Sequence, residues 1–463
     1  MSLVNRLGVV FGIALYTLAF NISYATLVTN IFSYMGFGYH QLNSTIMFAT
    51  YALCLVPAFW MPPITRPSML LFLSQYILIY IPASFILHYS SIPVFDDVTA
   101  LELQAVMLLG LSIMQVSYYI PLAAIKPHPL TSSGFKALLA ILVVVPLGYL
   151  CITQGNTFRL TDFGPDNTDF RYEQLDAGSQ HLFSFIGAYG EMWLAYIVFP
   201  LLGAVGLFCK KRSLQVGVLL GYTLLYGLSA YRSQILAPAF ILFIYLWTRR
   251  AHKYTWLFGG VTVALLWPLA VPQESLQILR FLWVGLWHVR TFCIQGLEFG
   301  QYFEFFRVNP TTHFMQLNIF SVLGMSSPGI DPTSAVPGYF YGTPAGANAN
   351  FWANDGLTSL GVVGIPVMSI FCGALFWLLD SLATRFKLSF VLVWFAFLPV
   401  SFSNVSLFTN LLTGGFGFLM LLLYVAPEDG FMRRFLRPRA PVRMVKAIRN
   451  VSPLNARPGI VNG

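Results

Sequence analysis

The chain has 463 residues, of which 57% are hydrophobic and 9% are charged. A soluble domain carries about 25% charged residues, so this composition excludes an ordinary soluble protein and indicates an integral membrane protein. The net charge of +9 does not indicate a nucleic-acid-binding protein, because most of the basic excess lies in the C-terminal tail and in short loops.

Long apolar segments follow one another along the chain. A membrane span needs about 20 mostly apolar residues, and the first segment shows no signal-peptide cleavage site, so we expect it to be retained. The sequence therefore predicts an all-α polytopic membrane protein that forms one domain over residues 1–463. The twelve predicted spans are 8–29, 46–62, 69–89, 101–122, 137–153, 183–208, 214–230, 234–248, 255–271, 357–379, 388–404 and 408–425.

The basic residues are distributed unequally between the two sets of loops that these spans define. An even number of spans puts both termini on the same side, and this side holds every lysine and most of the 26 Lys and Arg residues. Because Lys and Arg are enriched in cytoplasmic loops, we predict that this side is cytoplasmic and that 426–463 is a basic cytoplasmic tail. The basic residues on the other side are Arg159, Arg171, Arg232, Arg280, Arg290 and Arg307.

Two of the predicted non-cytoplasmic loops are long. The loop 154–182 is polar, and it holds Arg159 and Arg171 among acidic residues, so we expect a solvated or gating loop. The loop 272–356 is the largest polar and aromatic segment in the chain, and its first part is apolar enough to lie on or dip into the membrane as a helix.

The glycines of this larger loop argue against one unbroken helix through its first part. They are Gly285, Gly296 and Gly300. If the segment is an α-helix, Arg280 and Arg290 are about 80° apart around the helix axis, which places them close to one face.

Arginines on the non-cytoplasmic side are candidate anion ligands, because a guanidinium pairs bidentately with phosphate or carboxylate. Arg232 lies between two apolar runs near the outer end of a span, where an ionisable residue is costly and therefore a functional candidate. The alternative is that Arg232 extends to the interface beside Tyr231. For Arg280 the alternative is an ordinary ion pair with Glu298.

Proton acceptors are also present in the larger loop. His288 and His313 titrate near neutral pH when unperturbed, so either is a candidate base, although a structural, hydrogen-bonded role is the alternative for each. The carboxylates Asp355 and Glu304 are further candidates. No phosphate-binding loop and no His, Cys or Asp cluster with metal-ligand spacing is present, so we expect neither ATP hydrolysis nor a metal or other cofactor.

Parts of the chain resemble a known family. The segments LRFLWVGLWHVRTF, GQYFEFFRVNPTTHF and ANANFWANDGLTSLGVVGIP are similar to bacterial oligosaccharide repeat-unit polymerases, the Wzy-type O-antigen and exopolysaccharide polymerases. The segment YRSQIL, which opens a span, also resembles the related O-antigen ligases.

The resemblance implies a metal-independent, GT-C-like glycosyltransferase of polysaccharide and lipopolysaccharide biosynthesis in the bacterial inner membrane. Its donor and acceptor would be undecaprenyl-pyrophosphate-linked glycans at the periplasmic face, in contact with membrane lipid, and a chain-length regulator is a possible partner. No nucleic acid is expected.

The chemistry of that reaction assigns roles to the candidate residues. Fixed guanidinium groups stabilise the charge that builds on a departing pyrophosphate, which suits Arg232, Arg280 and Arg290. His313 or Asp355 would accept the proton of the attacking sugar hydroxyl. The candidates for binding the glycan are Arg307, Glu304, Tyr302, Asn350 and Trp352.

Two other functions stay open at this point. An O-antigen ligase uses the same donor with a lipid A-core acceptor and a catalytic His, a role that His313 suits. A lipid-linked glycan flippase, or another transporter, would not be an enzyme, and its charges would line a central cavity.

Overall fold

A computed structural model describes residues 3–161, 170, 173–174, 184–271, 277–315, 330–342 and 350–437. In these ranges the regular elements are helices, and the one contact of β type is an isolated antiparallel bridge between Phe386 and Leu436. The predicted all-α fold is confirmed.

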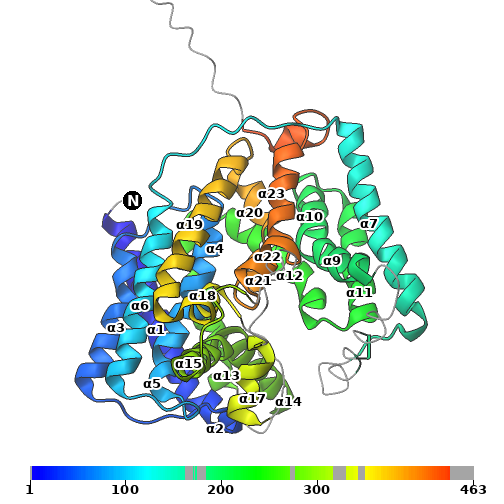
Figure 1. Ribbon diagram of the computed structural model, residues 1–463. Helices are drawn as coiled ribbons and strands as arrows, with labels where there is room; N and C mark the ends of the chain where they lie inside the picture. The colour runs from blue at the N-terminus through cyan, green and yellow to red at the C-terminus, as the bar shows by residue number, and fades with distance from the viewer. Residues whose placement is uncertain are drawn as a thin grey trace, which may run out of the picture.

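The helices pack side by side as a bundle (Figure 1). Up to residue 208 they are α1 (Leu3–Ser23), η1 (Tyr24–Val28), α2 (Thr29–Phe32), η2 (Ser33–Met35), α3 (Ser44–Phe59), α4 (Ser68–Ser74), η3 (Gln75–Tyr80), α5 (Ile81–Tyr89), α6 (Asp97–Val116), α7 (Ser132–Gln154), η4 (Gly155–Thr157), α9 (Ser184–Trp193), η5 (Leu194–Val198) and α10 (Phe199–Phe208). They continue with α11 (Arg212–Ser229), α12 (Arg232–Thr248), α13 (Lys253–Ala270), α14 (Gln277–Trp283), η6 (Val284–Cys293), α15 (Ile294–Val308), α17 (Pro332–Tyr341), α18 (Trp352–Leu360), η7 (Gly361–Val363), α19 (Gly364–Ala383), α20 (Leu388–Trp394), α21 (Leu398–Phe402), α22 (Leu407–Leu412), α23 (Phe416–Val425) and η8 (Met432–Phe435).

Polar residues that precede apolar runs fix where several helices begin. Asn43 accepts a hydrogen bond from a backbone N–H at the start of α3, and Thr131 does the same for α7. At the start of α6, the carboxylate of Asp96 accepts the backbone N–H of Thr99 at 2.8 Å, and this bond lowers the pKa of Asp96. Each side chain satisfies an N–H group that the helix itself leaves unpaired.

Among the described residues, seven helical segments are long and apolar enough to cross a membrane, so the chain is a multi-pass membrane protein by length and composition. They are Arg6–Met35, Ser68–Tyr89, Asp97–Val116, Ser132–Thr157, Ser184–Phe208, Trp352–Ala383 and Leu407–Val425. Each corresponds to one predicted span. Ser44–Phe59 and Arg232–Thr248 are apolar but shorter, and they correspond to two more of the predictions.

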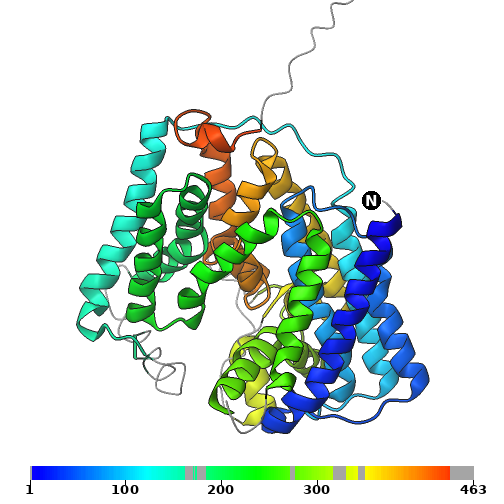
Figure 2. The same cartoon turned by 180° about the vertical axis from the view of Figure 1, so that it is seen from behind.

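The connections between helices gather at two ends of the bundle. At one end, the guanidinium of Arg66 donates to the carbonyls of Ser117 and Ile120, and the N–H of Arg437 donates to Arg385 at 2.7 Å. Figures 1 and 2 show the N-terminus, the 117–131 connection and the chain after α23 together at this end. We call it the basic end, because these connections hold basic residues that the sequence assigned to the cytoplasm.

The predicted span 388–404 does not form a continuous helix. The chain makes two short helices, α20 and α21, with a turn at 395–397 between them, and α22 and α23 are likewise separated by a turn in which Gly415 has a φ of 81°. Residues 391–399 are all buried. Irregular backbone is tolerated at membrane depth where protein covers it, which explains why this break is stable inside the bundle.

The prediction that glycines interrupt the helix after residue 272 is also wrong for the described part. There α14, η6 and α15 follow one another without interruption over 277–308. The glycines serve close packing. A Cβ at Gly296 would lie 2.8 Å from the Cα of Ala83 in α5, and one at Gly300 would lie 2.9 Å from the ring of Phe95.

Candidate functional site

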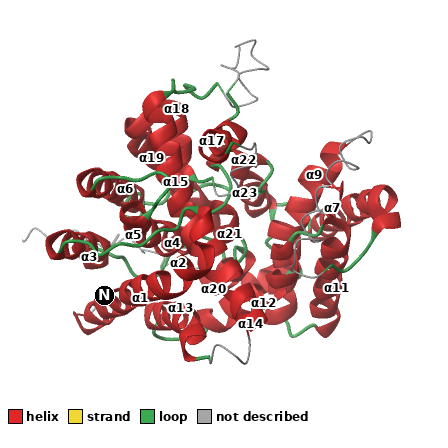
Figure 3. Cartoon of the chain, turned by 90° about the horizontal axis from the view of Figure 1, so that it is seen from below, coloured by secondary structure: helices red, strands yellow, loops and turns green. Residues whose placement is uncertain are grey.

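Polar side chains are concentrated between α15 and α18, which lie beside each other in the views of Figures 1 and 3. On α15 the residues at helical spacing are Gln295, Glu298 and Tyr302, and α18 contributes the consecutive residues Asn354 and Asp355. All five are buried. We call these five residues the polar layer.

Tyr302 lies within the polar layer. Its hydroxyl makes no hydrogen bond to another described residue. Burial raises the pKa of Tyr302, and the carboxylates of Glu298, Asp355 and Asp331 raise it further. The phenol therefore stays protonated and keeps a donor to offer beside acidic groups. Its ring is fully buried, so it is not available to stack on a sugar at the surface.

Asn354 gives the polar layer a second group with unused capacity. It is fully buried, and neither its amide nitrogen nor its amide oxygen bonds another described residue. Buried amides are normally hydrogen-bonded, and a buried polar group without a protein partner is commonly found with ordered water or a ligand. The polar layer therefore has donors and acceptors left over for such a molecule.

Asp355, a candidate proton acceptor from the sequence, is bound within the protein. Its Oδ2 accepts the backbone N–H of Leu407 at 2.7 Å, at the start of α22, and the residue is 3% exposed. The carboxylate thus ties α18 to the broken helix pair α22–α23. This position favours a structural role over direct contact with an acceptor hydroxyl.

Trp352 and Asn350 lie at the start of α18. The sequence suggested that both bind glycan at the surface. Trp352 is 2% exposed, and its ring fills the space above Gly110 of α6, where an added Cβ would lie 2.7 Å from it. It is therefore a packing residue between helices, not a platform for a sugar. Asn350 is half-buried, and its side-chain oxygen accepts the N–H of Phe351 at 2.9 Å.

His313 is exposed beside the polar layer. The backbone N–H of His313 donates to the carbonyl of Ser359 at 3.0 Å, and the backbone N–H of Thr312 donates to the carbonyl of Thr358 at 2.8 Å. These bonds hold the chain after α15 against the end of α18. His313 and Phe314 have φ values of 49° and 66°. Left-handed backbone in two successive non-glycine residues costs about 1 to 3 kcal/mol each and is concentrated at functional sites.

Arg307 and Glu304 form an ion pair with each other on the outer face of α15. Their side chains approach to 2.7 Å, and the bond to Glu304 raises the pKa of Arg307. An exposed pair of this kind is weak, so either charge is readily exchanged for a charge on a ligand.

Arg280 lies on α14, which packs against α13 through the Trp283 indole, a donor to Ala264 at 3.0 Å. The Nε of Arg280 is buried without a hydrogen bond, and Arg280 forms no ion pair with Glu298 or any other described residue. Arg290 is exposed on η6. Because η6 is a π-helix with wider turns than an α-helix, the predicted separation of about 80° between the two arginines does not apply.

His288 is structural. It is 1% exposed, and its Nε2 lies 2.9 Å from the carbonyl of Leu265, to which it must donate. Burial lowers the pKa of His288 to about 4. Of the two candidate bases, exposure favours His313.

Arg232 is half-buried in the first turn of α12, just after Ala230, which has a φ of 56°. Two residues on, the amide of Gln234 donates to Glu191 of α9 at 2.6 Å and accepts the hydroxyl of Ser229 of α11 at 3.1 Å. This buried network fixes the start of α12 and so the position of Arg232.

The main neighbours of α12 are α10, α11, α13 and α20, whereas α15 packs on α5, α17, α18 and η6. Arg232 therefore belongs to a different part of the bundle from the polar layer. The structure brings Glu304, Arg307, His313 and Asp355 to the α15–α18 region and does not join Arg232 to them.

The described start of the loop that holds Arg159 contacts the end of α11, because the backbone N–H of Arg159 donates to the carbonyl of Gly227 at 3.1 Å. Its guanidinium lies over the Phe170 ring and 3.9 Å from Glu173. Arg159 is thus engaged within its own loop, as its acidic surroundings suggested. Arg171 lies outside the described residues.

The sequence analysis did not predict two polar clusters, the network around Gln234 and the polar face of α15. The Ser229–Gln234–Glu191 network joins residues far apart in the chain, so no local pattern reveals it. The polar face of α15 did leave a signal, since Gln295, Glu298 and Tyr302 recur at helical spacing within an aromatic segment. Among the described residues, no group of three His, Cys, Asp or Glu is placed to hold a metal ion.

Comparisons with known proteins return no relatives. No protein-family model matches the chain, and neither the curated proteins nor the solved structures include a match.

Proposed function

We propose that the protein polymerises undecaprenyl-pyrophosphate-linked oligosaccharide repeat units into O-antigen or exopolysaccharide. The observation that carries the proposal is the continuous helical segment 277–308, followed by a turn that hydrogen bonds from Thr312 and His313 hold against the end of α18. Arg280 and Arg290 lie in the first part of this segment, and Arg307 and the exposed His313 lie toward its other end, beside the buried polar layer.

The proposal includes an orientation. The chain crosses the bacterial inner membrane twelve times in a GT-C-like arrangement, with both termini and the basic end in the cytoplasm. The loops 154–182 and 272–356 then face the periplasm, where the lipid-linked donor is presented. The loops on this face hold no lysine and only six of the arginines, which supports this orientation.

The reaction is a single displacement. An acceptor sugar hydroxyl attacks the anomeric carbon of the donor, a new C–O bond forms, and the bond to pyrophosphate breaks with its electron pair on the leaving oxygen. His313, which is exposed, takes the proton of the hydroxyl. Arg280 and Arg290 stabilise the pyrophosphate, and in-line attack inverts the anomeric centre.

Arg232 takes a supporting role in this scheme. It lies in another part of the bundle from Arg280, and we assign it to the lipid-linked substrate at the start of α12. The exchangeable Arg307–Glu304 pair is assigned to the glycan.

Deletion of the gene tests the proposal. Loss of a polymerase leaves lipid A-core carrying a single repeat unit, which gel analysis of the lipopolysaccharide resolves. Complementation with Arg280→Ala, Arg290→Ala or His313→Ala should fail to restore long chains, whereas Arg159→Ala, a loop variant of the same charge change, should restore them. Normal chain length in the deletion strain would contradict the proposal.

Arg232 is tested by two substitutions in the same assay. Arg232→Lys keeps the charge and loses the bidentate fork, so we expect shorter chains and lower yield. Polymer of normal length and amount with Arg232→Ala would remove this residue from the site.

Transport is a second candidate, favoured by the broken helices α20–α21 and α22–α23, since many transporters bind substrates at discontinuous helices. Loss of a flippase would leave bare core and accumulated lipid-linked single units. Loss of a ligase, the other alternative, would leave bare core and lipid-linked polymer. The same deletion strain therefore separates all three functions.

A further inference from the structure

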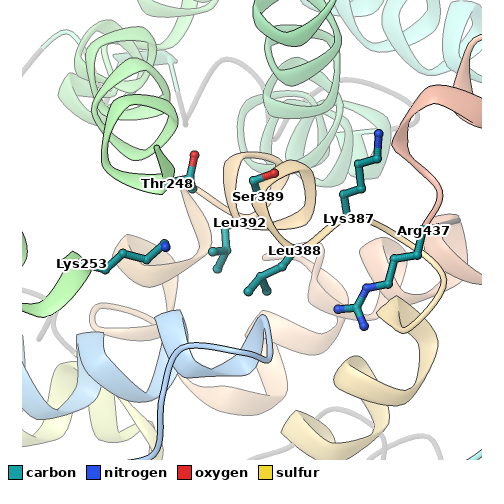
Figure 4. A pocket seen from close by; sticks show the side chains of 7 residues that line it. All are labelled: Thr248, Lys253, Lys387, Leu388, Ser389, Leu392 and Arg437. Atoms are coloured by element: carbon teal, nitrogen blue, oxygen red, sulfur yellow. The ribbon is translucent and has the colours of Figure 1, made fainter. Parts of the chain in front are cut away.

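A cavity of about 370 Å³ lies at the basic end. In the proposed orientation it faces the cytoplasm, on the opposite side of the membrane from the loop 272–356. Three separate parts of the chain line it: the α12–α13 connection, the start of α20 and the segment after α23. Its lining residues are Thr248, Lys253, Lys387, Leu388, Ser389, Leu392 and Arg437. We call it the basic-end pocket (Figure 4).

The charge of the pocket is one-sided. Three of its lining residues are cations, two carry hydroxyl groups, and none is acidic. Two acidic residues of the basic end are engaged elsewhere: Asp380 accepts two hydrogen bonds from Ser68, and Glu428 lies 3.8 Å from Arg385. The sequence after Asp429 holds no Asp or Glu that would neutralise the pocket.

Two of the cations point into the pocket from opposite sides. Figure 4 shows the Lys253 ammonium and the Arg437 guanidinium directed toward the leucines between them, while the Lys387 ammonium is turned away. Lys387 instead donates to the carbonyl of Arg434 at 2.7 Å. Lys253 and Arg437 therefore define the binding position.

Hydrogen bonds anchor both inward cations without using up their donors. Arg437 donates through Nε to the carbonyl of Phe386 at 2.8 Å, which leaves its two terminal nitrogens without a bond to a described residue. Lys253 makes one long bond of 3.3 Å to Arg250. A fixed guanidinium fork opposite an ammonium matches the oxygens of a phosphate group.

We propose that the basic-end pocket binds a phosphate group. Its volume suits a small headgroup, and Leu388 and Leu392 give it an apolar wall beside the cations. Basic pockets between helices on the cytoplasmic side bind phosphate headgroups of anionic lipids, and a soluble phosphate monoester offers the same chemistry. This proposal does not depend on the proposed function, because none of its residues belongs to the polar layer or to segment 277–315.

Lipid binding and soluble-phosphate binding are measured separately on the full-length protein. In one arm, the protein is placed in phosphatidylcholine nanodiscs that contain phosphatidylglycerol, and native mass spectrometry counts the phosphatidylglycerol molecules retained. In the other arm, glycerol 3-phosphate is titrated into the detergent-solubilised protein and the thermal midpoint is followed. Binding in the first arm alone identifies a lipid headgroup, and binding in the second identifies a soluble phosphate.

The test variant is the double substitution Lys253→Gln with Arg437→Gln. We expect binding about thirtyfold weaker, the loss for two cations at a phosphate. The control is Lys211→Gln with Arg212→Gln, which removes the same two charges from exposed positions that do not line the pocket. The control should bind as the unmodified protein does.

Ser389→Leu supplies a test that keeps the cations and fills the pocket. We expect it to lose binding as the double variant does. Absence of binding in both arms would overturn the proposal, and so would an equal loss in the test and control variants, which would assign binding to surface charge. Retained binding in Ser389→Leu with its normal thermal midpoint would overturn it as well.

Discussion

Tyr302 has a buried hydroxyl with no described partner, which makes it the sharpest residue for separating stability from function. Tyr302→Phe removes a group that contributes no hydrogen bond, so we expect a free energy of unfolding close to that of the unmodified protein. The matched control is Tyr222→Phe, because the Tyr222 hydroxyl is equally buried but donates to Ala195 at 2.5 Å.

The control should lose about 1 kcal/mol of stability, measured by thermal or denaturant unfolding in detergent. If Tyr302→Phe lowers stability as much as Tyr222→Phe does, the hydroxyl has a structural partner. If stability is kept and polymer formation falls, the hydroxyl acts on substrate.

His288 predicts a pH dependence of stability. Its pKa in the folded protein is about 4, below the ordinary value of 6.5. Between these values the unfolded chain binds a proton that the folded chain excludes, so stability is lost as the pH falls through this window and is fully present above it. The difference amounts to about 3 kcal/mol at most.

The thermal midpoint of the purified protein, measured from pH 7 to pH 4.5, checks this expectation. His288→Gln keeps an N–H donor for the Leu265 carbonyl and removes the titration, so its midpoint should fall less steeply with pH. Parallel curves for the two proteins would mean that other groups control the acid sensitivity.

Residue types in the sequence identified what could act chemically, but burial decided which of them is available. His313 was a candidate by type, and its exposure and left-handed backbone strengthen it. Trp352 was also a candidate by type, yet it is buried against Gly110 of another helix, α6. No local pattern contains that contact, so the sequence could not have excluded Trp352.

At the scale of elements, the close contact between α15 and α5 depends on glycine. A Cβ at Gly296 would lie 2.8 Å from a backbone atom of Ala83, and backbone cannot move aside cheaply. We expect Gly296→Ala to destabilise the protein by about 1 to 3 kcal/mol through overpacking.

The control for this substitution is Gly259→Ala, at an exposed position of α13 where an added Cβ meets nothing within 4 Å. It should stabilise the protein by up to about 1 kcal/mol, because alanine is the better helix former. Unfolding midpoints of the two variants that move in the same direction would contradict the packing argument.

Hydropathy located the long helices well, because a continuous apolar run of sufficient length has few alternatives to a helix. The break in 388–404 was missed, although Pro399 marks it: proline lacks an N–H and is found in the first turn of α21. The run is uniformly apolar, so hydropathy alone reads it as one span. The break is stable because other helices bury it, and which helices pack there cannot be read from the local sequence.

For the whole molecule, the separation of charge between the two ends predicts how the protein lies in the membrane. Lys211 lies in the short α10–α11 connection, and the backbone N–H of Arg159 bonds the far end of α11 at Gly227. Cysteine at each position, in a Cys151→Ser background, reports its side through labelling with a membrane-impermeant maleimide.

In intact cells whose outer membrane is permeable to the reagent, Arg159→Cys should be labelled and Lys211→Cys should not. Lys211→Cys should become reactive only after the inner membrane is opened. The reverse pattern would place the basic end outside the cytoplasm and would remove segment 277–315 from the side on which the proposed reaction occurs.

The broken segment α20–α21 also has a consequence for how the chain is made. Part of its cover comes from helices that precede it in the chain: α20 packs on α10 and α12, α21 packs on α4, and the Trp394 indole donates to the carbonyl of Ile197. The later helices α22 and α23 add to the cover of α21 through Asn410 and Phe416. The preceding helices are synthesised first, so their faces precede the break into the membrane. Order of synthesis thus supplies part of the protein cover that an irregular segment needs at membrane depth before that segment is made.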